Sequence, residues 1–340
     1  MKIGSVVLAL CAAVALAGCP NQAKNDSLAL MKEANEAYGK KNYDAAIPKY
    51  EEAVGKWADN HTAHYGLSGA QFYKKNYVKA AEHAKKAVNI EPTQAMYQLW
   101  AGRMSYEKAK DETRKAQAKD KDPGSVDIDF SHAPFDEALG HLQEAVKLNN
   151  ELWRAHFLIG NIYFYQQKPK DAAAELTKAL ESAPKTENTP WIQLAELYRQ
   201  WDYPDAAIQV AQQGVQVVLD DKHKSDLYYE IGAGYDEKNN LKDAVTNYKL
   251  AIDMAKDNHR AKFMLGQALY KKGDYVEAKT QLEAFSKSSG QGNSFFKDQA
   301  GRMLLEIQMK QANPGGVPSG GGEKKLSPED MVKKAQGAKK

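Results

Sequence analysis

Between Ser27 and Gly292 the chain repeats itself with a period of 34 residues, and this periodicity restricts the possible folds more than any other feature. Seven repeats fill the stretch if the third is divided by 24 extra residues: 27–60, 61–94, 95–152, 153–186, 188–221, 225–258 and 259–292. Such a period is typical of stacked helix pairs, because one pair cannot bury its apolar face without a neighbour. We therefore expect an all-α solenoid of about seven helix–turn–helix units.

Two positions of the repeat carry small side chains throughout. Position 8 is occupied by Ala34, Ser68, Gly102, Gly160, Ala195, Gly232 and Gly266. Position 20 is occupied by Ala46, Ala80, Ala138, Ala172, Ala207, Ala244 and Ala278. These positions are predicted to be the points where the two helices of a unit cross, since the distance between helix axes depends on side-chain size at the contact.

The pattern resembles the tetratricopeptide repeat (TPR) family, whose position 27 is also small in six of these seven repeats. The resemblance implies a right-handed solenoid whose first helices line a concave surface that binds proteins or peptides. Position 27 of the last repeat is Phe285, and an amphipathic run follows it. We expect residues 293–312 to form a C-terminal capping helix that packs over Phe285.

The same resemblance implies that positions 2, 5, 9 and 12 of each repeat face the concave groove. The candidate partner-binding residues at these positions are Asn35, Tyr38, Tyr65, Phe72, Arg103, Tyr106, Arg154, Phe157, Asn161, Phe164, Arg199, Tyr229, Arg260, Phe263, Gln267 and Tyr270. Aromatic rings beside Arg are typical of protein-binding hot spots, although each ring has an alternative role in packing between repeats. Some TPR proteins grip a C-terminal carboxylate with Lys and Asn, but Met31 and Gly66 occupy two of the positions needed.

The third repeat is interrupted by a charged insert near residues 107–132. We expect 107–119 to prolong the first helix, Pro123-Gly124 to end it, and 125–132 to form a loop. The second helix of the repeat is expected to begin near Pro134. Insertions in repeat arrays usually project from one face.

The first residues have the pattern of an export signal. Lys2 is followed by an uncharged apolar stretch, Ile3 to Leu16, and Leu16-Ala17-Gly18-Cys19 resembles the lipobox of bacterial lipoproteins. The resemblance implies a signal peptide at 1–18, acylation of Cys19 with a diacylglycerol and a further acyl chain such as palmitate, and a tether at 19–26. Residue 20 is Pro rather than the Asp of many inner-membrane lipoproteins, which favours the outer membrane. Alternatively, Ala15-Leu16-Ala17 is an ordinary cleavage site that releases a soluble periplasmic protein.

The last part of the chain differs in composition from the repeats. Residues 313–322 are rich in Gly and Pro, which predicts a flexible linker. Residues 323–340 have a net charge of +3 and a helix-start pattern at Leu326-Ser327-Pro328. They are either a short docking arm or a disordered end.

Composition and motifs give no indication of catalysis. Lys and Arg number 47 against 44 Asp and Glu, so the basic excess of a nucleic-acid-binding protein is missing. Both cysteines lie within the first 19 residues. His61 and His64 lack a third metal ligand, and the cluster Asp120, Asp122, Asp127 and Asp129 lacks the Glu that ends a calcium loop. We expect no enzyme activity, no metal and no cofactor.

The expected function is therefore that of a membrane-anchored TPR scaffold or assembly factor in the bacterial cell envelope. A lipobox followed by TPR units resembles the pilotins that help assemble type IV pilus secretins. It also resembles lipoprotein adaptors that gather cell-wall hydrolases, and the motifs do not choose between these roles. The alternative is a soluble periplasmic TPR binding module without a lipid anchor.

Overall fold

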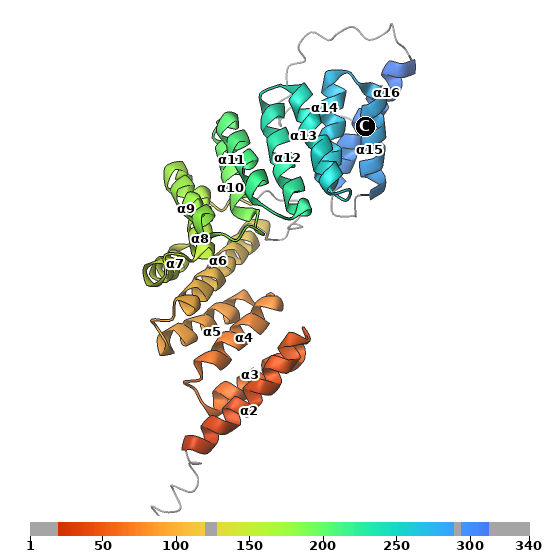
Figure 1. Ribbon diagram of the computed structural model, residues 1–340. Coiled ribbons are helices and arrows are strands. Elements are labelled where there is room, and N and C mark those ends of the chain that lie inside the picture. Colours follow the sequence, from red (N-terminus) through yellow and green to blue (C-terminus); the bar gives the residue numbers. More distant parts are fainter. Residues whose placement is uncertain (1–19, 120–127, 289–293, 313–340) are drawn as a thin grey trace, which may run out of the picture. The chain divides into compact units, whose positions relative to one another are not determined.

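The computed structural model describes residues 20–119, 128–288 and 294–312, and within these ranges the chain forms helices and no strands. The helices are α2 (Pro20–Gly39), α3 (Tyr43–Lys56), α4 (His61–Tyr73), α5 (Tyr77–Ile90), α6 (Ala95–Ala118), α7 (Asp136–Leu148), α8 (Trp153–Tyr165), α9 (Pro169–Ser182), α10 (Thr189–Gln200), α11 (Pro204–Val217), α12 (Asp221–Glu237), α13 (Leu241–Met254), α14 (His259–Lys272), α15 (Tyr275–Ser288) and α16 (Ser294–Ala312). Seven consecutive helix pairs begin with α2 and α3, and α16 follows them (Figure 1). The predicted all-α solenoid of TPR units is confirmed.

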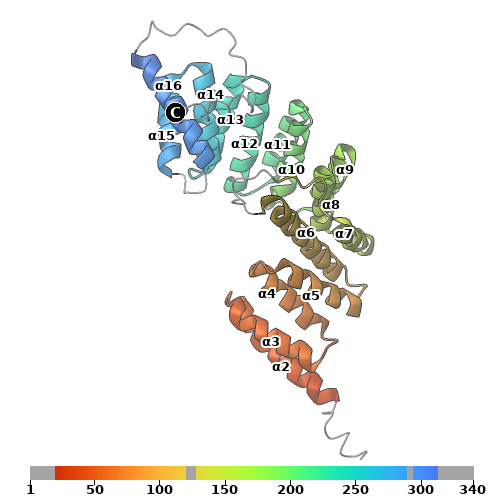
Figure 2. The same cartoon turned by 180° about the vertical axis from the view of Figure 1, so that it is seen from behind.

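The chain divides into two compact bodies, residues 1–223 and 224–340. We call them the N-terminal body, which holds repeats one to five, and the C-terminal body, which holds repeats six and seven with α16. In each body the helices follow one another in chain order, as the two opposite views show (Figures 1 and 2). Among the described residues, no helix combines the length and apolarity that a membrane crossing requires.

The turn inside the repeat has a backbone signature at position 15. A positive φ occurs there in every repeat except the third: Lys41, Lys75, Gln167, Asp202, Asn239 and Gly273, with φ between 56° and 91°. The left-handed residue ends the first helix, so the second helix starts a few residues later. Only the seventh repeat uses Gly, the residue best suited to this conformation. In the third repeat the helix runs on instead, and the first positive φ follows at Lys119.

Where the two helices of a repeat cross, the residue at position 8 lies against the side chain at position 24, and the sizes of the two residues are related. A methyl group placed on Gly102 would lie 2.6 Å from Cγ of Leu142, and one on Gly266 would lie 2.7 Å from Cγ of Leu282. Ala195 in repeat five faces a smaller residue at the equivalent place, Ala211. In repeats three, four, six and seven a large side chain at position 24 is therefore matched by Gly at position 8, which keeps the interior close-packed.

Successive repeats are joined by a hydrogen-bonded pair of Asn and Ser. Asn60 caps α4 by accepting from Ala63 N at 3.0 Å, and its amide donates to Oγ of Ser27 at 2.9 Å. Ser27 in turn donates to the carbonyl oxygen of Ala53 at 2.7 Å. The same arrangement recurs at Asn258 and Ser225 in the C-terminal body, at 2.8 Å. One Asn side chain thus satisfies a helix start and holds two helix pairs together.

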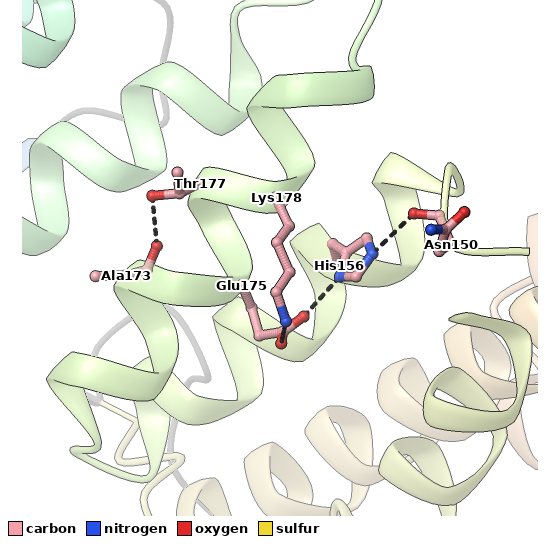
Figure 3. A network of polar contacts seen from close by, with 6 residues as sticks. All are labelled: Asn150, His156, Ala173, Glu175, Thr177 and Lys178. Atoms are coloured by element: carbon pink, nitrogen blue, oxygen red, sulfur yellow. Dashed lines mark hydrogen bonds and ion pairs between the residues drawn. The ribbon is translucent and has the colours of Figure 1, made fainter. Parts of the chain in front are cut away.

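A second polar contact links the two helices of repeat four. His156 is buried, and its Nε2 donates to the carbonyl of Asn150 at 3.1 Å (Figure 3). Its Nδ1 lies 2.6 Å from the carboxylate of Glu175, which also accepts from Lys178 at 2.8 Å. Burial of these groups is tolerated because each has a partner.

Equivalent contacts occupy the same positions of repeats two and three. Nε2 of His64 donates to a carbonyl six residues upstream at 3.1 Å, which leaves Nδ1 to accept from Nδ1 of His83 at 3.0 Å. In repeat three the upstream carbonyl accepts from Gln98 at 3.0 Å, and Nδ1 of His141 donates to Oε1 of Gln98 at 2.8 Å. We call these three pairs the interhelix polar ladder. It keeps its register in repeat three although 43 residues separate Gln98 from His141.

The ends of the solenoid differ partly from the sequence-based boundaries. Helix α2 begins at Pro20, so residues 20–26 continue the first helix and do not form the expected tether. The reason is that this polar stretch contains good helix formers and no residue that breaks a helix after Pro20. Helix α16 occupies the range expected for the capping helix, and Phe285 is buried in one cluster with Ala300 and Ile307 of α16. The expected signal peptide at 1–18, Cys19 and the segment 313–340 lie outside the described residues.

The insert of repeat three begins as an extension of α6, as expected, and α6 reaches Ala118. The segment that returns to α7 packs against the neighbouring helices. Phe130 lies 5.2 Å from Tyr165 between ring centroids, and Phe135 lies 5.4 Å from Tyr106. Asp129 accepts hydrogen bonds from Ser131 within its own loop, whereas Asp120, Asp122 and Asp127 are outside the described residues.

Candidate functional site

The N-terminal body has a groove of about 580 Å³ that is formed by the first helices of repeats two to five. Helix α6 supplies one side of it and α8 the other, with smaller contributions from α4 and α10. Its lining residues are Tyr65, Met96, Leu99, Trp100, Arg103, Tyr106, Glu107, Lys110, Trp153, Arg154, Phe157, Leu158, Asn161 and Thr189. We call this cavity the α6–α8 groove.

Six candidate residues lie in this groove: Tyr65, Arg103, Tyr106, Arg154, Phe157 and Asn161. They come from three successive repeats, and the parallel stacking of first helices brings them together. Tyr106 contributes mainly to packing, because it is only 5% exposed and burial raises its pKa. The other five present aromatic, cationic and amide groups to the cavity.

The aromatic rings on the α6 side form a connected surface. Tyr65 lies 5.4 Å from Trp100 between ring centroids, and Nε1 of Trp100 donates to Oγ of Ser68 at 2.8 Å. Burial raises the pKa of Tyr65, so its hydroxyl stays protonated and is a neutral donor. On the α8 side, Phe157 and Trp153 meet edge to face at 6.4 Å. These rings offer apolar area together with the hydroxyl donor of Tyr65, because the N–H of Trp100 is already used.

Three cations line the groove, and each rests on aromatic rings. The guanidinium carbon of Arg103 lies 5.1 Å from Phe72 and 5.6 Å from Trp100, measured to ring centroids. The ammonium of Lys110 lies 5.0 Å from Tyr106. Arg154 lies 4.4 Å from Trp153 and pairs at 3.5 Å with Glu187, which lies between repeats four and five. Within the described part of the chain, neither Arg103 nor Lys110 has an ion-pair partner.

The amide of Asn161 is the least satisfied polar group of the groove. Asn161 is 8% exposed, and its Oδ1 is buried without a hydrogen-bond partner among residues 20–119, 128–288 and 294–312. Burying a polar group without a partner costs about 1–3 kcal/mol, which a ligand can recover by supplying a donor.

Five candidate residues of the N-terminal body lie outside the groove cavity. Asn35 accepts a hydrogen bond from the hydroxyl of Tyr50, and Tyr38 packs against two other tyrosine rings. Phe72 supports Arg103 from behind. Phe164 packs on Trp201 at 5.5 Å, and Arg199 is half-buried on α10.

The candidate residues of the C-terminal body divide between a small cavity and the contact with α16. Tyr229, Arg260 and Phe263 line a cavity of about 160 Å³ that Phe296 of α16 helps to close. The guanidinium of Arg260 stacks on Tyr229 at 4.4 Å. The hydroxyl of Tyr270 donates to Glu306 of α16, and half-buried Gln267 lies on α14 without lining this cavity.

Three residues that line the groove were not among the residues predicted from the sequence: Trp100, Trp153 and Lys110. The two tryptophans occupy positions 6 and 1, outside the four positions assigned to the groove. Helix periodicity could have identified both tryptophans. Trp100 follows Met96 by four residues and Trp153 precedes Phe157 by four, so each tryptophan shares a helix face with a residue at a groove position. Lys110 lies beyond the usual length of a first helix, and the extension of α6 brings it to the groove.

The two histidines considered as metal ligands have other partners. Nδ1 of His61 lies 2.8 Å from the hydroxyl of Tyr97, and His64 belongs to the interhelix polar ladder. Within the described ranges, no group of three or more His, Cys, Asp or Glu has the arrangement of a metal site.

The comparisons with known proteins agree with this architecture. Among solved structures, a TPR protein from Parabacteroides merdae shares 12% identity and a TM-score of 0.56, with 84% of this chain and 99% of that chain covered. The C-terminal part of a TPR protein from Cytophaga hutchinsonii also gives 12% and 0.56, with 79% and 98% covered. At this identity the likeness shows the fold alone. The search of curated proteins gave no match.

The family profile of the tetratricopeptide repeat matches residues 31–95, 132–186 and 229–285, which together are just over half of the chain. Each matched segment covers parts of the helix pairs described above, and the gap before residue 132 coincides with the insert of repeat three. The chain therefore belongs to the tetratricopeptide repeat family and is a protein–protein interaction module.

Proposed function

We propose that this protein is a lipid-anchored scaffold or assembly factor of the bacterial cell envelope that holds a partner protein by a peptide segment in the α6–α8 groove. Two independent features support the proposal. The lipobox ending at Cys19 supports export and anchoring, and the groove supports peptide binding. The proposed role requires binding alone, so we propose no catalytic activity, and an isolated partner should be chemically unchanged after contact with the protein.

The uncommitted amide of Asn161 is the observation that carries the peptide-binding proposal. A peptide backbone presents one donor and one acceptor at each residue, and a side-chain amide matches both. A rotation of the Asn161 side chain toward the cavity would let its Oδ1, which has no partner among the described residues, accept a backbone N–H of the partner. Phe157 and Trp100 lie in the same cavity and offer apolar surface to the partner's side chains. This combination of a polar anchor and aromatic surface is that of an interface hot spot.

Site-specific photocrosslinking in the native host tests the groove. A photoreactive amino acid replaces Met96, which lines the groove and is 49% exposed. The matched control replaces Lys147, an exposed residue of α7 that does not line the groove. We expect discrete partner adducts from position 96 and none of these from position 147.

Two further substitutions assign the adducts to groove binding. Asn161→Ala and Phe157→Ala, each combined with the reactive group at 96, should weaken the adducts, whereas Asn150→Ala should not. Asn150 is exposed and lies outside the groove. Identical adduct patterns from positions 96 and 147 would show that partners are not held in this groove.

Substitution of Cys19 tests the anchor. The wild type and Cys19→Ala are expressed in the native host with a labelled fatty acid, and the envelope is fractionated. We expect label and outer-membrane location for the wild type and the loss of both in the variant, since two or three acyl chains anchor firmly. A wild type without label in the soluble periplasmic fraction would favour the alternative, a free periplasmic binding module.

A further inference from the structure

The cations of the α6–α8 groove point to the chemistry of its ligand. We infer that the groove selects a partner segment with two acidic side chains separated by one to three neutral or apolar residues. This inference rests on the proposed function, because it names the class of peptide that the same groove binds. Three charged residues of α6 that line the groove indicate this preference: Arg103, Glu107 and Lys110.

These three residues share one face of α6. Glu107 follows Arg103 by four residues and precedes Lys110 by three, and such spacings place side chains on the same side of a helix. At a rise of about 1.5 Å per residue, Arg103 and Lys110 are about 10 Å apart along the helix axis. An extended peptide advances about 3.3 Å per residue, so acidic residues two to four positions apart span this distance when the cations' long side chains adjust.

Arg103 and Lys110 are available to a ligand carboxylate. Neither forms an ion pair with any residue that the structure describes, and both are held over aromatic rings, which leave their positive charge without a carboxylate partner. An Arg stacked on an aromatic face keeps its N–H edge for a planar carboxylate. The ammonium of Lys110 lies 5.0 Å from the ring centroid of Tyr106, 5.4 Å from that of Phe130 and 5.7 Å from that of Tyr165, and Lys110 still lines the groove.

The other charges around the groove refine this pattern. Arg154 adds a third cation on the α8 side, but Glu187 already pairs with it at 3.5 Å. Glu107 lines the groove between the two available cations, so a third carboxylate placed opposite it would be repelled. The one to three residues between the two acids are therefore neutral or apolar, and they can lie against Tyr65, Trp100 and Phe157.

A single C-terminal carboxylate fits this arrangement less well than two side-chain carboxylates. One carboxylate can reach only one of two cations that are about 10 Å apart. The inference therefore commits to internal Asp or Glu side chains of a protein partner.

Selection from a random peptide library tests this inference. The purified full-length protein in detergent selects from twelve-residue peptides displayed through their C-terminus, so that no free terminal carboxylate is offered. We expect the selected pool to be enriched in paired Asp or Glu that flank one to three neutral or apolar residues. The double variant Arg103→Gln, Lys110→Gln should still select apolar residues and should lose the acidic enrichment.

Affinities of a selected acidic peptide then compare individual variants by fluorescence anisotropy. Arg103→Gln should weaken binding about tenfold, the equivalent of one charge-assisted hydrogen bond. Lys110→Gln should weaken binding and Lys110→Arg should restore it, whereas Glu107→Gln should strengthen binding about twofold to threefold. Lys115→Gln is the matched control on the same helix, because Lys115 is exposed, pairs with Asp111 and does not line the groove.

The possible outcomes separate the two proposals. Enrichment of apolar peptides without acidic residues, unaffected by the double variant, would overturn the acidic preference and leave the peptide-binding function standing. A pool without any enrichment would overturn both. Acidic enrichment that disappears equally in Lys115→Gln would reflect net charge alone and would also overturn the assignment to Arg103 and Lys110.

Discussion

Substitution of Gly102 by Ala tests whether the close approach of α6 and α7 determines the stability of repeat three. The added methyl group would lie 2.6 Å from Cγ and 2.8 Å from Cδ2 of Leu142, and 3.2 Å from the carbonyl oxygen of Ala138. Leu142 and Ala138 are both fully buried, so the leucine cannot rotate into solvent and the backbone must shift. Overpacking of this kind costs about 1–3 kcal/mol, and the better helix propensity of Ala returns about 1 kcal/mol. We expect a net destabilisation of up to about 2 kcal/mol.

Gly140 in α7 provides the matched control. It lies inside a helix of the same repeat, is exposed, and has no atom within 4 Å of the position of a methyl group. Gly140→Ala should therefore stabilise the protein by about 0.5–1 kcal/mol through helix propensity alone. The same amino-acid change is expected to have opposite signs at two positions on packed helices.

Thermal unfolding followed by far-UV circular dichroism measures the difference. A change of 1 kcal/mol moves the Tm of a body of this size by about 2–4 °C. Because repeat arrays need not unfold in one step, hydrogen exchange of α6 and α7 should accompany the melting curve. Equal or higher stability of Gly102→Ala relative to the wild type would refute the packing argument.

Three other predictions concern the polar contacts and the capping helix. Burial lowers the pKa of His83 from its usual 6.5 to about 4, so the unfolded chain binds a proton that the folded chain does not. The stability of the folded protein should fall as the pH decreases from about 6.5 to 4. His83→Gln, which can still donate to His64, should reduce this fall. Identical profiles of Tm against pH for the wild type and the variant would show that His83 is not the group responsible. Asn60→Ala should lower the urea midpoint by the equivalent of about 2 kcal/mol and Asn42→Ala by about 1 kcal/mol, because Asn42 caps α3 only. Equal losses would mean that the contact with Ser27 adds nothing. Lys310 of α16 lies 4.9 Å from the ring centroids of Tyr270 and Tyr275, so Lys310→Met should accelerate hydrogen exchange of α16 about threefold. Unchanged exchange there would show that α16 is held by its apolar contacts alone.

The helix pairs were predictable because their determinants are local and periodic. Ala138 and Gly102 mark the helix crossing in the sequence as clearly as in the structure, where both are buried. The left-handed residue at position 15 was not predictable from composition. Five different residue types adopt that conformation, so the repeat geometry imposes it and the residue type does not.

The groove was predictable in its position but not in its membership. The family resemblance implied that Arg154, Phe157 and Asn161 face the groove, and the structure places all three in the cavity. The position of Asn35 shows why other candidates lie elsewhere. Its amide oxygen accepts from the hydroxyl of Tyr50, and this contact depends on a tyrosine at position 24, where repeat six also has tyrosine and the other five repeats have leucine or alanine. A repeat rule that treats all units alike cannot anticipate such individual partners.

The interhelix polar ladder also shows how the architecture tolerates new sequence. In repeat two, three residues connect α4 to α5, whereas in repeat three the connection from α6 to α7 is roughly six times as long. Lengthening a flexible loop by this factor costs only about 1.5 kcal/mol. The contact between Gln98 and His141 nevertheless keeps the geometry of its counterparts in repeats two and four.

A short connection at this turn is therefore not required for the packing of the repeat. The turn between α6 and α7 is a natural place for evolution, or for a protein engineer, to add a domain without disturbing the neighbouring repeats. Because the prolonged α6 carries Lys110 into the groove, additions at this turn can also change what the groove recognises. An array of similar units can acquire an individual specificity by lengthening one of its turns.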